Sequence, residues 1–401
     1  MTQTSEQLPA YPMVRPDPLA PPPEFGRLRG QRPVSKVRLF DGGTAWLVTS
    51  YDLARKVYRD TRFSSDPRKP GFPQFSPGSS VLKKQDRSLL RMDPPEHRVH
   101  RKMLVPEFSP GRSESYLPDI RAAADQAIDD LLSGPNPADL VKGFALPVPS
   151  LVICSLLGVP YADHEEFHLH SRIRVSQASS PEQVNAANQA LIGMLDRLVT
   201  AKEGDPGDDL ISRLMTGENT GKLSHDELVM MALLMLFAGH ETTANMLSLG
   251  VLTLFHHPEQ HAELRADPSL WPAAVEELMR FLSIAHVSPA RAATVDIELG
   301  GELIKAGDGV IIPLMAANWD DEAFPAAERF NIHRPNPVNH IGFGYGVHQC
   351  IGQTLARLEL QTALRQLTER VPTLRLAAPV GELPFKHEAL FYGLYQLPVS
   401  W

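Results

Sequence analysis

One long segment, residues 224–257, constrains the fold of this chain more than any other feature, because it reads as a continuous helix. At about 1.5 Å per residue such a helix is roughly 45–50 Å long and would cross a whole domain. Its most apolar stretch, residues 228–239, is shorter than the roughly 20 residues that a bilayer crossing requires, and acidic residues flank it. We therefore expect a soluble protein organised around this helix, without a membrane-spanning segment.

Helical patterns dominate the rest of the chain, so the predicted fold class is mainly α with small β-sheets (α+β). Ser50 is expected to cap a helix that runs to about residue 60. Other helices are predicted at residues 94–105, 113–133, 149–158, 161–172, 182–203, 207–216, 268–282 and 351–370. Short β-like segments lie at 37–40 and 45–50, joined by a glycine turn that predicts a hairpin, and within 290–313 and 374–398.

The first 23 residues hold seven of the 36 prolines, which remove backbone donors and fix φ. We therefore predict an extended arm over residues 1–23. No repeat or clean linker interrupts the remainder of the chain, and an apolar fraction of 43% is enough to bury a sizeable core. We expect a single domain over residues 24–401.

Charge and cysteine content exclude several classes of protein. Thirty-nine lysines and arginines against forty-seven aspartates and glutamates give a net charge of −8, which disfavours nucleic acid as a partner. Two cysteines, Cys154 and Cys350, exclude a disulfide scaffold and a four-cysteine metal site. The start of the chain has neither a basic run nor an apolar run, so no signal peptide is predicted. These features favour a cytoplasmic protein.

The ten residues FGYGVHQCIG, 343–352, carry the strongest chemical signal. Gly344 and Gly346 permit a tight turn and a close backbone approach to something large and flat. Cys350 then stands where the last long helix is predicted to start. The dipole and unpaired N–H groups of a helix start favour a thiolate, and they would temper its charge if the sulfur bound a metal. The alternative is a structural thiol in a glycine turn, which the full ten-residue arrangement disfavours.

Three further patterns contain polar side chains whose burial would cost free energy unless they are paired. Glu241 and Thr242 sit mid-helix between apolar stretches, as either an ordinary polar stripe or a functional pair. Glu277 and Arg280 share one helix face, which predicts a buried ion pair. His97 and Arg101 are four residues apart, so that both can donate toward the same side.

Taken in order, these segments resemble the cytochrome P-450 superfamily. The string 343–352 is similar to its haem-binding loop, AGHETT at 238–243 to its oxygen-activation motif, ELMR at 277–280 to its ExxR motif, and MDPPEH at 92–97 with Arg101 to its haem-edge helix. The resemblance covers nearly the whole chain after the arm and is typical of soluble actinobacterial hydroxylases. It departs from many relatives at Val99, where they carry arginine.

The resemblance implies the fold of that family, with haem b held between the long helix and the C-terminal cysteine-bearing helix. Cys350 would be the axial ligand of the haem iron, and the other haem-binding positions would be Ala238, His97, Arg101, Arg291, Phe343, Gly344 and His348. His97, Arg101, Arg291 and His348 among them resemble the propionate partners. Glu241 and Thr242 would deliver protons to oxygen. Arg334 would join Glu277 and Arg280 in a structural ion-pair network.

The resemblance also implies a reaction and partners. It predicts a monomeric mono-oxygenase that hydroxylates an apolar small molecule with O2, receiving two electrons from a ferredoxin and its NAD(P)H-dependent reductase, because the chain carries no flavin or iron–sulfur signature. Candidate docking charges are Arg98, Lys102, Arg112, Arg357 and Arg365. A macrolide, polyene, steroid or statin-like acid would all fit, and Lys83, Lys84 and Arg87 hint at a carboxylate or polyol at the mouth. The alternatives are a peroxide-driven haem enzyme and a non-enzymatic haem or ligand-binding protein.

Overall fold

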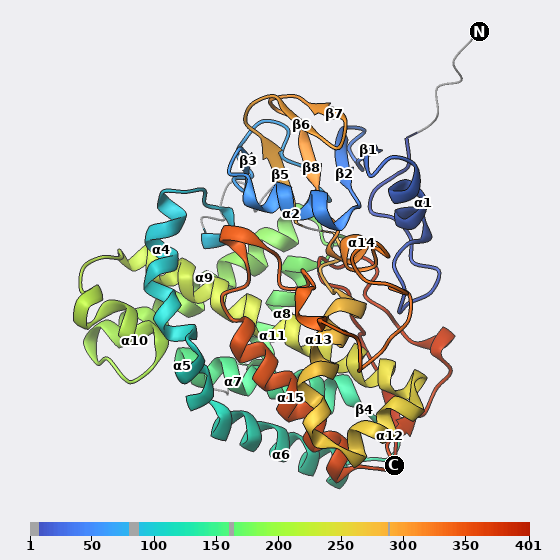
Figure 1. The fold of residues 1–401 in the computed structure, drawn as a ribbon. Coiled ribbons are helices and arrows are strands. Elements are labelled where there is room, and N and C mark those ends of the chain that lie inside the picture. The colour runs from blue at the N-terminus through green and yellow to red at the C-terminus, as the bar shows by residue number, and fades with distance from the viewer. Residues whose placement is uncertain (1–7, 80–87, 160–163, 288) are drawn as a thin grey trace.

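A β-rich region at one end of the molecule and a larger helical region below it make up the fold (Figure 1). The computed structural model describes residues 8–79, 88–159, 164–287 and 289–401. Its longer helices are α6 (Leu117–Ser133), α7 (Pro147–Leu157), α8 (His164–Val175), α9 (Pro181–Gly204), α11 (His225–His256), α13 (Trp271–Leu282) and α15 (Gln353–Arg370). Shorter ones are α1 (Pro23–Gln31), α2 (Tyr51–Arg59), α4 (Glu96–Leu104), α5 (Pro110–Ser115), α10 (Leu210–Met215), α12 (Pro258–Ala266) and α14 (Leu314–Asn318).

The long helix α11 forms as predicted and passes through both large apolar clusters of the molecule. Ser224 caps its start and exchanges hydrogen bonds with Glu227 in a capping box, while Pro258 follows its end. Residues from Leu228 to Leu236 pack with α7 and α9 in one cluster, and residues from Met246 to Leu254 pack with α13 and α15 in the other. Helix α11 therefore sets the positions of the elements on both sides of it.

The main sheet joins the N-terminal hairpin to strands from the last third of the chain. Its strand order is β1-β2-β8-β5-β3, and only β2 and β8 among these pairs run parallel. Two smaller sheets have the orders β4-β10-β9 and β6-β7. The strands are β1 (Val34–Arg38), β2 (Thr44–Val48), β3 (Phe63–Ser64), β4 (Ala138–Asp139), β5 (Ala290–Ala293), β6 (Ile297–Leu299), β7 (Glu302–Ile304), β8 (Gly309–Ile311), β9 (Arg375–Leu376) and β10 (Pro398–Ser400).

The structure differs from the predicted elements mainly at prolines. Helix α1 begins at Pro23 and α12 begins at Pro258, and neither was predicted, although proline is well suited to the first turn of a helix. The helix predicted from residue 268 begins as α13 at Trp271, after a short 3₁₀ turn. Ser50 does precede α2, but its side chain makes no capping hydrogen bond.

The described part of the N-terminal arm, residues 8–22, contains no helix and lies against the body of the molecule. Ala10 forms a parallel bridge with Arg38, and the Tyr11 hydroxyl donates to the Val287 carbonyl at 3.1 Å. The side chain of Arg15 is buried, and its guanidinium carbon lies 4.0 Å from the centre of the Tyr392 ring. The division into an arm at 1–23 and one domain at 24–401 stays a prediction.

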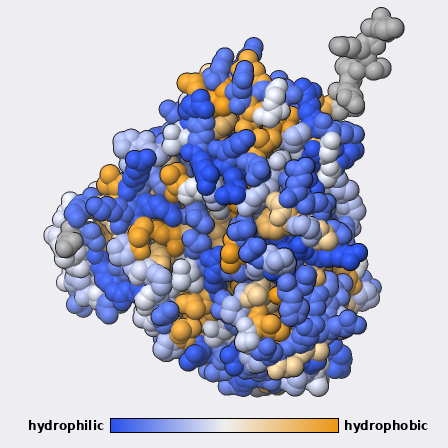
Figure 2. Space-filling view, in the orientation of Figure 1, coloured by the Kyte–Doolittle hydropathy of each residue, from blue (hydrophilic) through white to orange (hydrophobic). Residues whose placement is uncertain are grey.

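Hydrophilic residues cover most of the face that carries α4 and α15, and hydrophobic residues show there as small separate patches (Figure 2). Within the described ranges, none of the helices has both the length and the apolar character that a membrane crossing needs.

Candidate active site

A cavity of about 380 Å³ lies among α11, α15 and the loop that contains Cys350. Helix α11 contributes an apolar wall with Leu233, Phe237 and Ala238. Other described residues of the lining include Arg91, His97, Arg101, Arg174, Val175, Leu234, Thr242, Met246, Ile284, Arg291, Phe343, Gly344, His348, Cys350, Glu359, Leu390 and Phe391. All eight predicted haem-binding residues line this one cavity, and so does Thr242.

The cysteine loop folds back on itself through its glycines. Gly344 and Gly346 both have φ of 72°, a backbone region that other residues rarely adopt. A Cβ atom at Gly346 would also clash with the Tyr58 carbonyl oxygen. The Cys350 N–H donates to the Phe343 carbonyl at 2.8 Å, which closes the loop and directs the cysteine to the cavity.

Helix α15 begins at Gln353, three residues after Cys350, so the sulfur precedes the helix rather than opening it. Burial raises the pKa of the Cys350 thiol, while the Gly352 N–H and the charges of Arg101 and Arg357 act in the opposite direction. The helix-start donors predicted from the sequence are therefore present, but burial outweighs them. A metal cation bound to the sulfur would favour the thiolate at this position.

Four basic side chains from α4, β5 and the turn at 346–348 converge on the cavity. His97 and His348 have ring centroids 4.2 Å apart, and both ring nitrogens of the buried His97 have no hydrogen-bond partner. Arg101 donates to the Gln349 carbonyl at 2.6 Å, and the buried Arg291 donates to the Ala290 carbonyl at 2.8 Å.

The four side chains of this cluster bring positive charge and hydrogen-bond donors together, and this raises the cost of charging the two histidines. Burial, then the charge of Arg101, lowers the pKa of His97 to about 4. Burial, then Arg291, His97 and Arg101, lowers the pKa of His348 to about 2. Buried donors, together with guanidinium charges that lower the pKa of both histidines, favour an anionic ligand. The cluster therefore fits the two propionates of a haem, with Cys350 beside the same cavity.

Thr242 and Glu241 are adjacent on α11, but their side chains contact different parts of the molecule. The Thr242 hydroxyl donates to the Ala238 carbonyl at 2.6 Å and borders the cavity. Glu241 is buried and is not among the described cavity-lining residues. Its Oε1 accepts from Lys386 Nζ at 2.6 Å, and its Oε2 lies 3.8 Å from His240 Nε2.

Lys386 holds Glu241 in its charged form. Burial alone would raise the pKa of Glu241, but the charge of Lys386 and the neighbouring His240 and Asn245 outweigh it, and the pKa lies below its ordinary value. Lys386 is itself buried and also donates to Asn245 Oδ1 at 2.9 Å. The two charges thus form a buried pair, 145 residues apart in sequence.

Replacing Lys386 by methionine is expected to destabilise the protein by about 3 kcal/mol at pH 7, since it leaves a buried carboxylate without its partner. In the wild type the depressed pKa of Glu241 contributes stability above the unfolded pKa, and that contribution is lost as pH falls through the folded value. In the variant burial raises the pKa, so stability instead falls as pH rises above about 4.3. Denaturant unfolding at several pH values should show the largest difference at pH 7.

The double variant Lys386→Met with Glu241→Gln serves as the control, because it removes both charges together. It should be more stable at pH 7 than Lys386→Met alone. Equal loss of stability in the single variant at pH 5 and at pH 7 would contradict the coupling.

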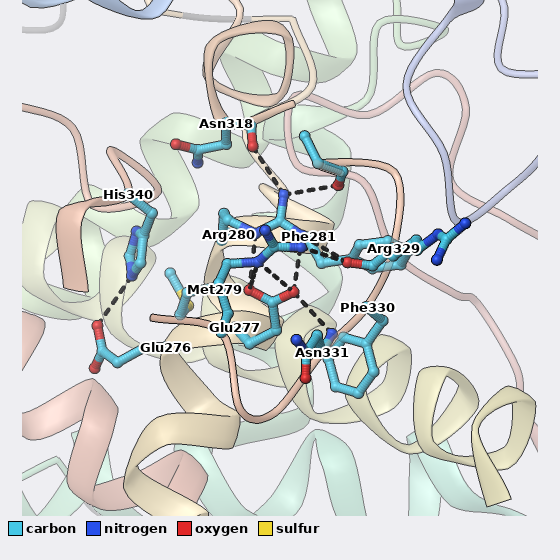
Figure 3. Close-up of polar contacts among 12 residues, drawn as sticks. Glu276, Glu277, Met279, Arg280, Phe281, Asn318, Arg329, Phe330, Asn331 and His340 are labelled. Atoms are coloured by element: carbon cyan, nitrogen blue, oxygen red, sulfur yellow. Dashed lines mark hydrogen bonds and ion pairs between the residues drawn. The ribbon is translucent and has the colours of Figure 1, made fainter. Parts of the chain in front are cut away.

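Glu277 on α13 lies between two guanidinium groups in the interior (Figure 3). Its carboxylate accepts two hydrogen bonds of 2.8 Å from Arg280 and two of 2.9 and 3.0 Å from Arg334. The Asn331 N–H adds a fifth at 2.9 Å. The remaining N–H groups of the two arginines donate to main-chain carbonyls at Asn318, Pro325, Ala326, Ala327 and Arg329.

The same helix connects this network to the cysteine loop. Glu276 binds His340 Nε2 at 3.0 Å at the start of the loop, and Arg357 Nη2 of α15 at 3.0 Å (Figure 3 shows the first contact). Burial opposes ionisation of Glu276, but His340 and Arg357 lower its pKa to about 2. Asn318 adds a link, because its Oδ1 accepts from the Ile341 N–H at 2.8 Å. Helix α13 therefore fixes both ends of the loop region that presents Cys350.

The five candidate docking residues differ in exposure and in whether a carboxylate of this chain pairs with them. Arg98 and Lys102 are exposed on α4. Arg357 is held by Glu276, and Arg365 is paired with Glu369 at 2.7 Å on the same helix. Arg112 lies 3.8 Å from Glu107. Lys83, Lys84 and Arg87 lie outside the described residues.

Three polar groups near the cavity were not predicted from the sequence: Arg174, Glu359 and Lys386. Each lies within a segment whose local pattern reads as an ordinary helix face or loop. The only signal that could have drawn attention to Lys386 is its place in a mostly apolar C-terminal segment. Glu359 carries none, although burial raises its pKa to about 8 and its Oε1 has no hydrogen-bond partner.

A family model described as "Cytochrome P450" matches residues 179–371. The chain is 46% identical to Cytochrome P450 105A3 of Streptomyces carbophilus, over 99% of this chain and 97% of that protein. It is 44% identical to the vitamin D3 dihydroxylase of Streptomyces griseolus, over 100% of this chain and 98% of that protein.

A solved structure shows the same architecture. The mycinamicin VIII C21 methyl hydroxylase MycCI of Micromonospora griseorubida, bound to mycinamicin VIII, superposes with a TM-score of 0.93 at 40% identity. The match covers 98% of this chain and 100% of that one.

Proposed function

The chain belongs to the cytochrome P450 family and is an oxidoreductase that uses haem; from this premise we propose that it hydroxylates an apolar organic molecule with O2. A ferredoxin and its NAD(P)H-dependent reductase supply two electrons. The observation that carries the proposal is the shared cavity, which has Cys350 and the basic cluster on its lining together with an apolar stretch of α11 and Thr242.

The haem contacts are assigned to the residues that line this cavity. Cys350 would bind the haem iron through its sulfur, and His97, Arg101, Arg291 and His348 would hold the propionates. Ala238, Phe343 and Gly344 would line the space for the macrocycle. Bound in this way, the haem supplies O2 activation, which a thiolate ligand favours by donating electron density.

The substrate binds against the apolar lining, where burial of its hydrocarbon surface supplies affinity. Leu233, Phe237, Ile284 and Phe391 belong to this part of the cavity. Two relatives have names that specify vitamin D3 and mycinamicin VIII, which are consistent with a large, mainly apolar substrate.

Proton delivery is assigned to Thr242 and Glu241. The Thr242 hydroxyl orders water on the cavity side, and Glu241 passes protons toward it. Because the Glu241 carboxylate is bound to Lys386, this transfer requires the carboxylate to turn from Lys386 toward Thr242. The pair of residues argues against a peroxide-driven enzyme or a simple haem carrier, neither of which needs a proton path.

Thr242→Ala is expected to reduce product formed per electron consumed by roughly tenfold or more, because a positioned proton-transfer group contributes about 10²–10⁴-fold. Electron consumption continues, and the balance appears as hydrogen peroxide. Thr253→Ala is the matched control, since the Thr253 hydroxyl makes the same kind of bond, to the Leu249 carbonyl at 2.8 Å, away from the described cavity lining. Unchanged coupling in Thr242→Ala would remove the assigned role.

The proposal as a whole is tested with the purified haem protein. Turnover with ferredoxin, reductase and NAD(P)H should exceed turnover with peroxide alone, and low ionic strength should speed reduction if Arg98 and Lys102 dock the ferredoxin. Faster turnover with peroxide would favour the peroxide-driven alternative. We further propose a cytoplasmic monomer, which size-exclusion chromatography with light scattering can check.

A further inference from the structure

The N-terminal arm places a buried positive charge outside the active-site cavity. The side chain of Arg15 is 5% exposed, and its guanidinium group stacks on the ring of Tyr392, which is fully buried. Neither residue is among the described residues that line the cavity. The stacked pair therefore lies at the seam between the arm and the C-terminal segment, apart from the site described above.

The polar atoms of this pair have no partners among the described residues. Arg15 Nε and the Tyr392 hydroxyl are both buried without a hydrogen-bond partner. No carboxylate in the described ranges forms an ion pair with Arg15. The face of an aromatic ring attracts a guanidinium group, but it offsets only part of the cost of burying a full charge.

The titratable groups around Arg15 do not supply the missing negative charge. Asp17 is exposed, and its Oδ1 accepts from the Leu19 N–H at 2.9 Å. The Tyr11 hydroxyl donates to a main-chain carbonyl, and His387 is exposed. Burial, then the charge of Arg15, lowers the pKa of His286 to about 3. The buried side chains around the guanidinium group are therefore neutral at pH 7.

Both members of the pair remain hydrogen-bond donors at neutral pH. Burial lowers the pKa of Arg15 to about 10, which leaves its guanidinium group charged. Burial raises the pKa of Tyr392 to about 12, against the charge of Arg15, so its hydroxyl keeps its proton. Water could accept hydrogen bonds from these donors but would not balance the charge, whereas an anion would do both.

We propose that a small monovalent anion, such as chloride, binds between Arg15 and Tyr392. It accepts hydrogen bonds from Arg15 Nε and from the Tyr392 hydroxyl, and it neutralises the guanidinium group. The anion thereby fixes the arm to a wall of the active-site cavity, because the Tyr392 N–H donates to the carbonyl of the lining residue Ile284 at 2.8 Å. This site goes beyond the proposed function, since no step of the reaction uses it.

Thermal unfolding of the full-length haem protein tests the site, with sodium chloride compared with sodium gluconate at equal ionic strength and scan rate. Chloride should raise the melting temperature along a saturable one-site curve, by about 3 °C at a hundred times its dissociation constant. Arg15→Met should remove this response. Tyr392→Phe should weaken it, because one of the two donors is lost.

Arg38→Met is the matched control, because the exposed side chain of Arg38 lies on β1 beside the arm. It removes the same charge and should leave the chloride response intact, while general effects of salt are common to all variants. A wild type that does not distinguish chloride from gluconate overturns the proposal. So does a response of equal size in Arg15→Met and the wild type.

Bromide locates the anion directly and needs no variant, so this measurement decides the question even if Arg15→Met does not fold. Crystals of the wild type in sodium bromide should show an anomalous scattering peak within hydrogen-bonding distance of Arg15 Nε. A structure in which only water or Asp17 contacts Arg15 counts against the site. A peak without a chloride response in solution would show an adventitious ion only, and it would count against the site as well.

Discussion

Replacing Cys350 by serine is expected to abolish substrate oxidation and to remove the thiolate signature from the carbon monoxide difference spectrum of the reduced protein. A serine hydroxyl stays protonated at neutral pH and does not supply the electron donation that favours O–O cleavage. The loop itself should persist, because the bond from the residue 350 N–H to the Phe343 carbonyl involves only the main chain. The defect is therefore chemical, and circular dichroism of the variant should match that of the wild type.

The second cysteine provides the control. Cys154 is buried on α7 as a small apolar side chain, so Cys154→Ala should cost about 1 kcal/mol of stability and leave the spectrum unchanged. A Cys350→Ser protein that still showed the thiolate spectrum would exclude Cys350 as the ligand. The assignment of the whole cavity would then have to be revised.

Predictions from the sequence were confirmed where the residues that encode a structural feature are neighbours in the chain. The glycine turn at 344–346 is encoded within three residues, and the capped, apolar α11 is continuous in sequence. Strand β9 lies within the β-like region predicted at 374–398, and it pairs with β10, which begins at the end of that region. In each case local geometry, helix capping or alternation of apolar residues encodes the element directly.

Predictions failed or were missing where the interaction joins distant segments. Nothing near Glu241 indicates that its partner is Lys386, and nothing near Arg174 indicates that it lies against Phe237. A resemblance to a family can identify Arg334 as a partner of Glu277, because the pairing recurs in that family. It cannot identify contacts that depend on how this chain packs its own α8 and C-terminal segment.

Replacing Glu277 by glutamine should cost about 5 kcal/mol of stability, more than Lys386→Met. The reason is that both Arg280 and Arg334 lose their counter-charge, and a guanidinium group does not shed its proton at any accessible pH. Lys386→Met is milder, because Glu241 can take up a proton and become neutral. The expected result is a protein that loses haem or unfolds at low denaturant concentration.

Glu369→Gln is the control variant that separates the stability effect of burying an ion pair from the effect of the pairing itself. Glu369 accepts one hydrogen bond of 2.7 Å from Arg365, a contact as short as those around Glu277, but both side chains are 40–50% exposed. Water screens that pair, so its loss should cost less than about 0.5 kcal/mol. If Glu277→Gln destabilised the protein no more than Glu369→Gln, the interior ion pairs could not be what holds α13 in position. They could then not hold the cysteine loop either, which α13 contacts through Glu276 and His340. A large difference would show that the position of Cys350 depends on charges placed beyond the cavity it serves.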